Sequence, residues 1–504
     1  MLLSLPRSTK AVIFVAFTST FLLFLHLIGT FPALPTKWRT TQHPQQATNS
    51  QAGLGPGRYG HAEAEASNAA MSTALSDAFH GSNADKADLD SISKSLPCHA
   101  LHGGEDVLVV MRTGATEIKD KLPAHLNTTF LCYKNLVIFS DYEEEFEGWK
   151  VHDVLAYVED EIKTSNSDMQ HYMHVLKVGR AGLDESELAG KNSYDSGPVG
   201  KVDNAGWRLD KWKFLPMMNS TYAMYPHLKW YVFVEPDTYV VWSNLIQWLG
   251  KLDPSEPLYF GSEVQIGDDV FAHGGSAFVL SRPALEKGVE SYRTRKSEWH
   301  EYTAGHWAGD CILGKALHDN GVELTWTWPM FQGGNPSLMD WKETKPERKL
   351  WCLPALSYHH LSPDEVQALF QFEQDWIREK HLSSSGRSFF GDSRDSPIMH
   401  HRDVFKQYVW PNLTTTRMDW NNTAEEHLPD TEGTNRSLGD CQALCEASST
   451  CIQYALGPNG CFIARDLRLG RASPGSESGW MNARIKDWVK DLDHCDASQG
   501  WSVT

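Results

Sequence analysis

The chain has 504 residues, of which 41% are hydrophobic and 22% charged, and this composition is typical of globular proteins with room for two or three domains. The formal net charge of -18 argues against a general binder of nucleic acids, because such a protein needs a basic surface that releases counterions from phosphates. Any nucleotide must therefore be held by a local site.

The N-terminal residues 1–31 indicate the compartment. Arg7 and Lys10 precede a run from Ala11 to Thr30 that contains no Asp, Glu, Lys or Arg. About 20 such residues span a bilayer, whereas a cleaved signal peptide has a shorter apolar region and a small-residue cleavage site. We therefore expect an uncleaved transmembrane signal-anchor, with its positive flank in the cytoplasm and the rest of the chain in the lumen.

Two further features are typical of the secretory pathway. The nine cysteines include a cluster near the C-terminus, and disulfides form in an oxidising compartment. Asn-x-Ser/Thr tripeptides offer glycosylation sites at Asn127, Asn219, Asn412, Asn421 and Asn435. Together with the anchor, these features predict a lumenal or extracellular protein.

Residues 32–95 are rich in Gln, Gly, Ala, Ser, Asn and Pro, and they contain few large apolar side chains that a core could bury. Such a composition predicts a flexible stem. Its simplest role is to hold a folded domain away from the membrane.

Globular patterning begins in the following segment, which we expect to form one domain over residues 96–410. Apolar runs at 105–114, 135–141 and 230–237 predict buried strands that alternate with helical stretches. This alternation implies an α/β sheet with helices on both faces, and ligands of such sheets bind beyond the carboxyl ends of the strands. Polar residues stand at these strand ends: Arg112, Thr113, Asp141, Glu235 and Asp237.

The segments after the first two strands predict several further elements. We expect a helical stretch over 207–230 that turns at Tyr225-Pro226, helices over 243–252 and 309–322, and a short strand over 257–262. In HGGSAFVLSRPAL, residues 273–285, two glycines precede an apolar run, and Ser281 with Pro283 predicts the start of a helix.

The C-terminal residues 411–504 form a linker and a small cysteine-rich module. Cys441, Cys445, Cys451 and Cys461 are separated by three, five and nine residues. Zinc binding is one interpretation, but no Cys-x-x-Cys pair and no nearby histidine favour it. Two disulfides that tie a helix to a small sheet fit the spacing better.

Four blocks occur in a fixed order: YVFVEPDTYVVWSNL, EPLYFGS, HGGSAFVLSRPAL and GDCILGKAL. With them the chain resembles, over about residues 100–380, glycosyltransferase family 31, in particular the branch with fringe and the core 1 β-1,3-galactosyltransferases. The resemblance implies a GT-A fold, which is a Rossmann-like sheet that binds a nucleotide sugar. It also implies a UDP-sugar donor, a divalent metal (Mn²⁺ or Mg²⁺) and an inverting transfer.

The family's acidic motif, Asp-x-Asp or Asp-Asp-Asp, reads Glu235-Pro236-Asp237 in this chain. The resemblance makes Asp237 a metal ligand and leaves Glu235 to reach the ribose hydroxyls or a metal-bound water. Relatives add a histidine from a late loop, for which His359 and His360 are the candidates. His359 is favoured because it follows an aromatic residue as in relatives, and two ordinary surface histidines are the alternative.

The block that holds the catalytic base in similar enzymes reads Gly309-Asp310 here, so that only its second acid remains. The resemblance implies that Asp310 takes the proton from the acceptor hydroxyl. An aspartate at this place is also typical of a helix N-cap, and the two roles are compatible.

The resemblance places six further residues at the donor. Arg112 and Thr113 contact the nucleotide, Asp141 reads the uracil edge, Lys213 faces the donor, and Gly274 and Gly275 let the backbone approach the sugar. Each residue also has a simpler interpretation, since polar residues at strand ends and glycines in turns are common.

The cysteine-rich module resembles a PAN/apple domain, which implies the pairs Cys441–Cys461 and Cys445–Cys451 and a role in holding carbohydrate or protein. For the remaining cysteines we expect Cys98–Cys132 and Cys311–Cys352, with Cys495 left over.

These observations favour an inverting, metal-dependent β-1,3-glycosyltransferase that transfers galactose from a UDP-sugar to a glycan acceptor on a glycoprotein or glycolipid, as a single-pass type II protein of the Golgi membrane. The rival is a catalytically inactive, membrane-tethered carbohydrate-binding protein. The rival is favoured because two blocks depart from the family's acidic motifs, at Glu235, Pro236 and Gly309. A glycosidase explains neither the anchor and stem nor the ordered blocks.

Overall fold

The structure is a computed structural model that describes residues 96–190, 204–345, 348–383, 397–428, 437–495 and Trp501. All of them belong to the unit Ala74–Thr504. The expected anchor (1–31) and stem (32–95) lie outside the described residues. Among the residues that are described, no helix combines the length and the apolar character that crossing a membrane requires.

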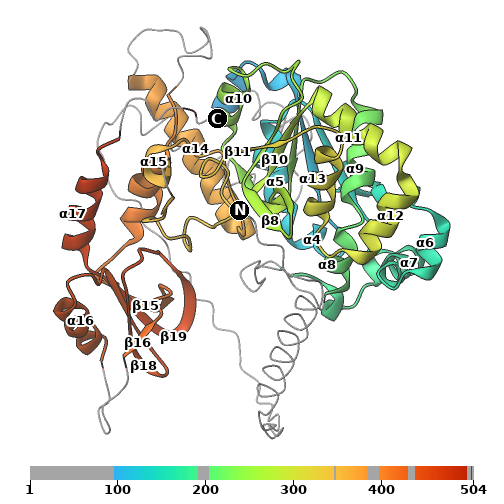
Figure 1. The fold of residues 1–504 in the computed structure, drawn as a ribbon. Coiled ribbons are helices and arrows are strands. Elements are labelled where there is room, and N and C mark those ends of the chain that lie inside the picture. The colour runs from blue at the N-terminus through green and yellow to red at the C-terminus, as the bar shows by residue number, and fades with distance from the viewer. Residues whose placement is uncertain are drawn as a thin grey trace, which may run out of the picture. The chain divides into compact units, whose positions relative to one another are not determined.

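The central sheet has eight strands in the order β11-β7-β10-β5-β1-β2-β4-β3 (Figure 1). The strands are β1 Val107–Arg112, β2 Leu136–Ser140, β3 Glu144–Phe146, β4 Trp149–Asp153, β5 Trp230–Val234, β7 Tyr259–Gly261, β10 Phe278–Ser281 and β11 Leu324–Trp326. β1 pairs in parallel with β2 and β5, whereas β10 runs antiparallel to β5 and β7. The three strands expected from the sequence are confirmed as the neighbours β5, β1 and β2.

Strand β1 is apolar on both faces because both faces are covered. Val107, Val109 and Met111 enter one hydrophobic core, whereas Leu108 and Val110 enter a second core on the opposite face. Successive side chains of a strand point to opposite faces, so a strand buried on both sides reads as a continuous apolar run. The first polar side chain therefore comes at the strand's carboxyl end.

Helices cover both faces of the sheet (Figure 1). The second core receives α9 (Phe214–Met224), α11 (Arg282–Thr294) and α13 (Gly309–His318), and the first core receives α10 (Trp242–Leu249) and α14 (Pro363–Ser383). The remaining helices are α4 Ile118–Lys121, α5 Pro123–Leu126, α6 Asp160–Ser165, α7 Met169–Val178, α8 Ala205–Asp210, α12 Lys296–Gly305, α15 His401–Val404, α16 Leu438–Ala447 and α17 Asn482–Leu492. The expected mixed α/β architecture is confirmed.

Most predicted elements are present with changed bounds. The helix expected over 207–230 is divided into α8 and α9. Ser281 caps α11 as predicted, because its side chain accepts the backbone N–H of Ala284 at 3.4 Å. The predicted glycine pair lies within a short 3-10 helix, η7 (Gly274–Ser276), which precedes β10.

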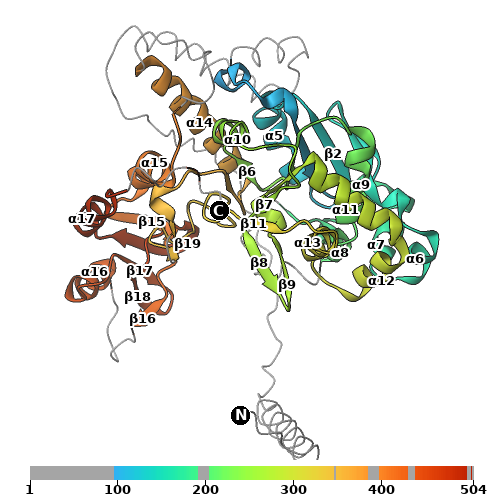
Figure 2. The same cartoon turned by 45° about the horizontal axis from the view of Figure 1, so that its top comes forward.

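Two small strand pairs flank the main sheet. β6 (Tyr239–Val240) pairs antiparallel with β14 (Ser357–Tyr358), which joins the end of the acidic motif to the late histidine loop. β8 (Glu263–Ile266) and β9 (Asp269–Ala272) form a hairpin that extends beyond the edge of the main sheet (Figure 2). Two-residue strands β12 (Thr344–Lys345) and β13 (Arg348–Lys349) form a further pair.

The C-terminal part contains an antiparallel sheet in the order β15-β19-β17-β18-β16. Its strands are β15 Thr416–Asn421, β16 Glu426–Leu428, β17 Gln453–Gly457, β18 Gly460–Ala464 and β19 Arg471–Trp480. The disulfide Cys441–Cys461 ties α16 to β18, and Cys445–Cys451 ties α16 to the segment before β17. Both expected pairs, and the helix tied to a small sheet, are confirmed.

Of the two disulfides predicted for the other cysteines, one is confirmed and one is wrong. Cys98–Cys132 is confirmed, but Cys352 pairs with Cys495 and not with Cys311. Cys311 is a buried free thiol on α13, where it packs against Phe271 of the hairpin. The rings of Trp351 and Trp488 pack at 5.3 Å between centroids, and this contact brings α17 and the following Cys495 to Cys352. The expectation that Cys495 is left over is therefore wrong.

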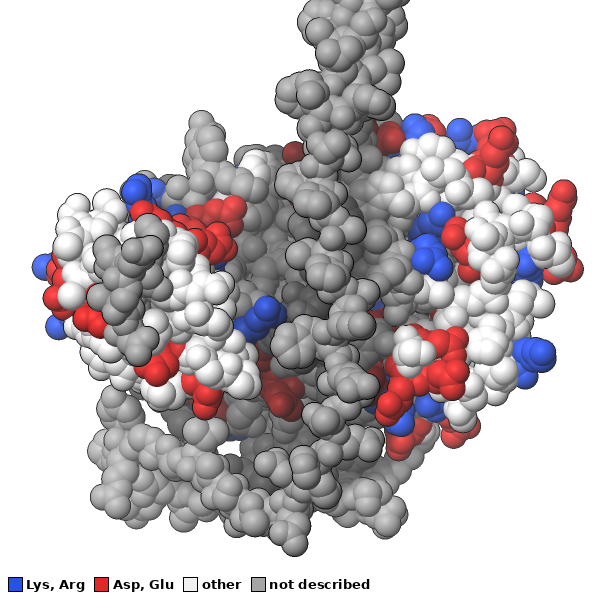
Figure 3. Space-filling model, turned by 90° about the horizontal axis from the view of Figure 1, so that it is seen from below, with Lys and Arg blue, Asp and Glu red and all other residues white. Residues whose placement is uncertain are grey.

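Charged side chains of both signs are interspersed on the face seen in Figure 3, and no extended basic patch stands on the described residues in that view.

Candidate functional site

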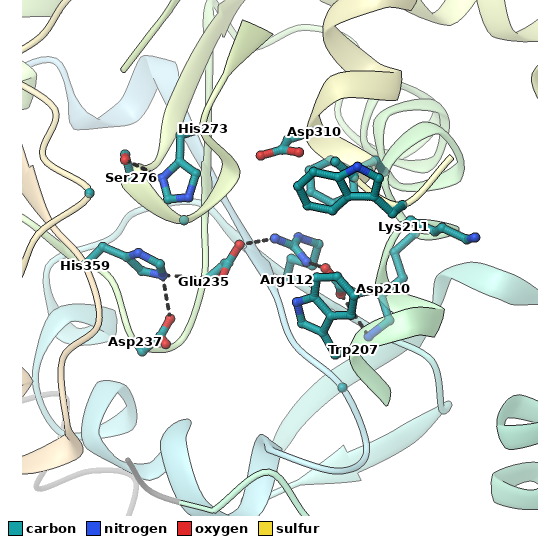
Figure 4. Close-up of a pocket in the computed structure, with 18 of the residues that line it drawn as sticks. Arg112, Trp207, Asp210, Lys211, Glu235, Asp237, His273, Ser276, Asp310 and His359 are labelled. Carbon is teal, nitrogen blue, oxygen red and sulfur yellow. Dashed lines mark hydrogen bonds and ion pairs between the residues drawn. The ribbon is translucent and has the colours of Figure 1, made fainter. Parts of the chain in front are cut away.

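A cavity of about 730 Å³ lies at the carboxyl ends of β1 and β5 (Figure 4). Seven residues expected from the sequence line it: Arg112, Lys213, Glu235, Asp237, Gly275, Asp310 and His359. The others, Thr113, Asp141 and Gly274, are not among the lining residues. The structure thus gathers residues from six separate segments of the chain at the place where a sheet of this kind binds its ligand.

Pro236 forms part of a turn that is held by buried hydrogen bonds. Its carbonyl accepts a hydrogen bond from Nε2 of His125 at 2.8 Å, and burial lowers the pKa of His125 to about 4, so this imidazole is neutral. Nε2 therefore carries the proton, and Nδ1 accepts from the hydroxyl of Thr129 at 2.8 Å. The Thr238 N–H closes the turn by donating to the carbonyl of Glu235 at 3.0 Å. The proline that replaces an acid thus belongs to a well-defined turn.

Strand pairing brings His359 to the acidic motif. Tyr358 of β14 is the register partner of Tyr239 of β6, so the residue after Tyr358 lies beside the residues before Tyr239. Nε2 of His359 is 3.4 Å from Oδ1 of Asp237 and 3.6 Å from Oε2 of Glu235 (Figure 4). The interpretation of His359 as an ordinary surface residue is wrong, since it is only 5% exposed.

The two adjacent histidines have opposite pKa shifts. Burial lowers the pKa of His359, but Asp237 and Glu235 outweigh it and raise this pKa to about 9. Burial and the neighbouring His359 lower the pKa of His360 to about 4. In the metal-free chain at neutral pH, His359 is therefore a cation that faces both carboxylates.

Asp237, His359 and His360 form a set that can hold a metal ion, because each offers one ligand atom and these atoms lie within 4.8 Å of one another. Nδ1 of His359 and Nδ1 of His360 are buried atoms without a hydrogen-bond partner. A carboxylate with two imidazoles suits a divalent ion such as Mn²⁺. The residues present fit the expected metal, and the structure adds His360 to the predicted pair.

Lys121 is a site residue that the sequence reasoning missed. Its Nζ lies 3.3 Å from Oδ2 of Asp237 and 3.0 Å from Oε2 of Glu117, and it lines the cavity. Burial lowers the pKa of Lys121, but Asp237 and Glu117 raise it well above its ordinary value. The available signal was the Glu117/Lys121 spacing of four residues, which places both on one helical face.

Arg112 holds Glu235 in an ion pair. Its guanidinium contacts Glu235 and Asp210, and it lies over the ring of Phe214 at 4.2 Å (Figure 4). Burial raises the pKa of Glu235, but Arg112 and His359 lower it below its ordinary value. Glu235 is therefore ionised, and it bridges the strand-end arginine and the histidine of the proposed metal set.

Lys213, which lines the cavity, forms a buried ion pair with Asp141, which does not. Nζ of Lys213 is 3.4 Å from Oδ2 of Asp141 and donates to the carbonyl of Thr113 at 2.8 Å. Burial raises the pKa of Asp141, but Lys213 and the N–H of Ala115 lower it overall. The pair braces the ends of β1 and β2, and Asp141 is fully buried in this arrangement.

Asp310 lies in the first turn of α13, whose N-cap is Ala308. The interpretation of Asp310 as the N-cap is therefore wrong. Its Oδ2 accepts the N–H of Gly274 at 2.9 Å, and its Oδ1 accepts the N–H of Cys311 at 2.9 Å. These hydrogen bonds hold the carboxylate at the cavity wall, where its oxygens can accept a further hydrogen bond.

Two glycines of the site make room for side chains. A Cβ on Gly275 would overlap the imidazole of His359, and a Cβ on Gly309 would overlap the ring of Phe214. The space at Gly275 is thus filled by a site histidine, whereas the resemblance suggested that it admits the sugar. At position 309 the packing also explains why no acidic side chain precedes Asp310.

His273 is a second residue that the sequence reasoning missed. It lines the cavity, its ring centroid is 5.4 Å from that of His359, and its Nδ1 is 2.7 Å from Oγ of Ser276. Burial and the neighbouring His359 lower the pKa of His273. The signal was its position directly before the glycine pair in the block HGGS.

Comparisons with known proteins agree with this geometry. The Fringe-like family model matches residues 201–383, which include the acidic motif, Asp310 and both late histidines. A glycoprotein-N-acetylgalactosamine 3-beta-galactosyltransferase 1 of Xenopus laevis is 26% identical over 179 residues, 32% of this chain and 50% of the relative. The chain thus spans about half the length of this curated relative. Both comparisons support a glycosyltransferase.

Proposed function

We propose that the chain is an inverting, metal-dependent β-1,3-glycosyltransferase of the GT-A fold, and that it transfers galactose from UDP-galactose to a glycan on a glycoprotein or glycolipid. The observation that carries this proposal is one cavity that holds the set Asp237, His359 and His360 together with Asp310, a carboxylate on α13. The matched family and the 3-beta-galactosyltransferase relative support the reaction and the sugar.

The donor end of the cavity is built for concentrated negative charge. Asp237, His359 and His360 would hold Mn²⁺ or Mg²⁺, and a bound divalent ion would neutralise the diphosphate and stabilise the departing UDP. Lys121 and Arg112 add two fixed cations that line the same space. A dinegative diphosphate next to Asp237 requires such compensation, because like charges at this range repel strongly in a poorly solvated site.

Asp310 is the proposed general base. The acceptor oxygen forms a bond to the anomeric carbon, the bond from that carbon to the UDP oxygen breaks, and the acceptor's proton passes to the carboxylate of Asp310. Attack from the face opposite UDP inverts the anomeric centre. The N–H groups of Gly274 and Cys311 position the carboxylate for this transfer.

The disulfides support the proposed compartment. Four disulfides join all the cysteines of the chain except Cys311, as expected for an oxidising lumen. We propose the Golgi lumen, with the N-terminal apolar run as the type II anchor. A tagged chain that stays cytosolic, with its cysteines reduced, would contradict this localisation.

UDP release from a panel of UDP-sugars tests the proposal. With Mn²⁺, we expect turnover of UDP-galactose above that of UDP-glucose and UDP-N-acetylglucosamine, and EDTA should abolish it. Asp237→Asn should lose turnover, whereas the matched control Asp253→Asn, a fully exposed aspartate outside the cavity, should retain it. If no UDP-sugar is consumed by the folded chain with Mn²⁺ and a glycan acceptor, the inactive carbohydrate-binding alternative is correct.

A further inference from the structure

The cavity has two ends of different chemistry. In Figure 4, His359 and Asp237 lie on one side, Trp207 and Lys211 lie on the other, and Glu235 stands between them. The first end carries the metal-ligand set. The second end carries aromatic surface, and nothing in the donor site described above uses it.

Trp307 is the most prominent part of this aromatic end. It lines the cavity and is 45% exposed, and no other tryptophan among the described residues is exposed to this extent. It stands three residues before Asp310 in the loop that enters α13. A large indole left exposed in a cavity wall is typical of a surface that binds a ligand.

The indole of Trp307 is held in place before any ligand arrives. Its ring is nearly parallel to that of Trp207, at 23° and 6.4 Å between centroids, and to that of His306, at 7° and 6.4 Å. The carbonyl of His306 accepts a hydrogen bond from Nζ of Lys211 at 2.8 Å, and the same Nζ is 2.8 Å from Oδ2 of Asp168. These contacts fix the loop, so binding would cost little conformational entropy.

We propose that Trp307, backed by Trp207, is the platform on which the acceptor sugar lies. The ligand class is a pyranose whose C–H-bearing face packs on the indole while one of its hydroxyls points to Asp310. This inference rests on the proposed function, because that function makes Asp310 the base.

The position of Trp307 favours the acceptor over the donor. A general base must lie within hydrogen-bond reach of the hydroxyl that it deprotonates, so the acceptor ring has to sit beside Asp310. The cavity lining also includes the apolar hairpin residues Val264 and Ile266, which pack against the cluster that contains Ala308, the residue after Trp307. An acceptor of more than one sugar, or a sugar with an apolar aglycone, would cover this longer surface.

The experiment compares the full chain with Trp307→Ala, Trp307→Phe and the control Tyr157→Ala, an aromatic residue that is 66% exposed and does not line the cavity. The acceptors are methyl glycosides of galactose, glucose, N-acetylgalactosamine and N-acetylglucosamine. We expect Trp307→Ala to raise the KM of the best acceptor about tenfold, Trp307→Phe to recover part of it, and Tyr157→Ala to have no effect. The affinity of Trp307→Ala for UDP in Mn²⁺ should stay unchanged.

Two results would overturn the inference. If the acceptor KM is unchanged in Trp307→Ala, Trp307 is not the acceptor platform. If the variant loses as much affinity for UDP as for the acceptor, the indole contacts the donor nucleobase instead. If the wild-type chain consumes no UDP-sugar, the proposed function fails by itself. Saturation-transfer NMR with the same methyl glycosides then decides: signals lost in Trp307→Ala support the platform, and equal signals contradict it.

Discussion

The imidazole of His359 fills the space beside Gly275 in which a Cβ would lie. The carbonyl of Gly275 in turn accepts the hydroxyl of Thr238 at 2.7 Å, directly after the proposed metal ligand Asp237. The glycine turn, the acidic turn and the histidine loop therefore form one packed unit. The position of the histidine depends on the absence of a side chain at 275.

We expect Gly275→Ala to displace His359. The overlap should lower the free energy of unfolding by about 1–3 kcal/mol, as overpacking does, and weaken Mn²⁺ binding. Denaturant unfolding and metal titration measure the two effects. In the double variant Gly275→Ala/His359→Ala, the stability should largely return while the metal affinity stays low. If the double variant is as unstable as the sum of the single ones, the two residues do not compete for space.

Lys121 competes with a metal ion for Asp237, because its Nζ lies 3.3 Å from Oδ2 of that carboxylate. We expect Lys121→Met to tighten Mn²⁺ binding to the donor-free chain and to weaken the affinity for UDP, since the diphosphate loses a cation. Calorimetry with Mn²⁺ and then with UDP separates the two effects. Lys163→Met, which changes a lysine far from the cavity lining, is the control. Unchanged Mn²⁺ affinity would show that the ammonium does not occupy the ion's place.

The metal-free chain should lose stability as the pH rises past neutrality. The pKa of His359 is raised from 6.5 to about 9 in the folded chain, so its charged form is favoured by folding. The stabilisation is complete below pH 6.5 and is lost as the pH rises through 9. Urea unfolding in EDTA across this range should show the decline in the wild type and not in His359→Gln. If the difference in the free energy of unfolding between the wild type and His359→Gln does not vary with pH, the raised pKa of His359 is refuted.

Mn²⁺ binding should show the opposite dependence on pH. A metal ion and a proton compete for the imidazole of His359, so metal affinity rises as the histidine loses its proton. Titrations of Mn²⁺ at several pH values should show this rise below pH 9, the pKa region of His359. The rise should disappear in His359→Gln, and a wild-type affinity that is flat with pH would exclude this histidine as a ligand.

Asp310→Asn should separate binding from chemistry. The amide oxygen can still accept one of the N–H bonds from Gly274 and Cys311, so we expect the fold and the UDP affinity to be retained. Transfer should fall by about 10²- to 10⁴-fold, because the amide cannot take the acceptor's proton. Single-turnover measurements with saturating donor and acceptor check this. An Asp310→Asn variant of near wild-type rate would remove the base assignment.

Much of the fold was predictable because the strands are apolar on both faces. The runs that became β1, β2 and β5 carry polar residues only at their ends, and these ends are where Arg112, Glu235 and Asp237 line the cavity. The ordered blocks then brought the late histidines to Asp237. Local pattern and resemblance thus indicated seven of the residues that line the cavity, but not Lys121 or His273.

Contacts between distant segments could not be predicted. Nothing near Lys121 in the sequence indicates that its partner is Asp237, because the ion pair exists only after β1 and β5 are aligned. The pairing of Cys352 with Cys495 depends on the packing of α17, and cysteine spacing carries no information about it. The same packing places Trp480 and Ile485 of the C-terminal part in the core shared with β1, so removing residues 430–504 would expose that core.

The most direct test of the central claim is calorimetric titration of UDP into the full chain. We expect clear binding to the wild type with Mn²⁺, loss of binding in EDTA, and weak binding to Asp237→Asn under both conditions. UDP affinity that is the same with Mn²⁺, with EDTA and in Asp237→Asn would contradict it.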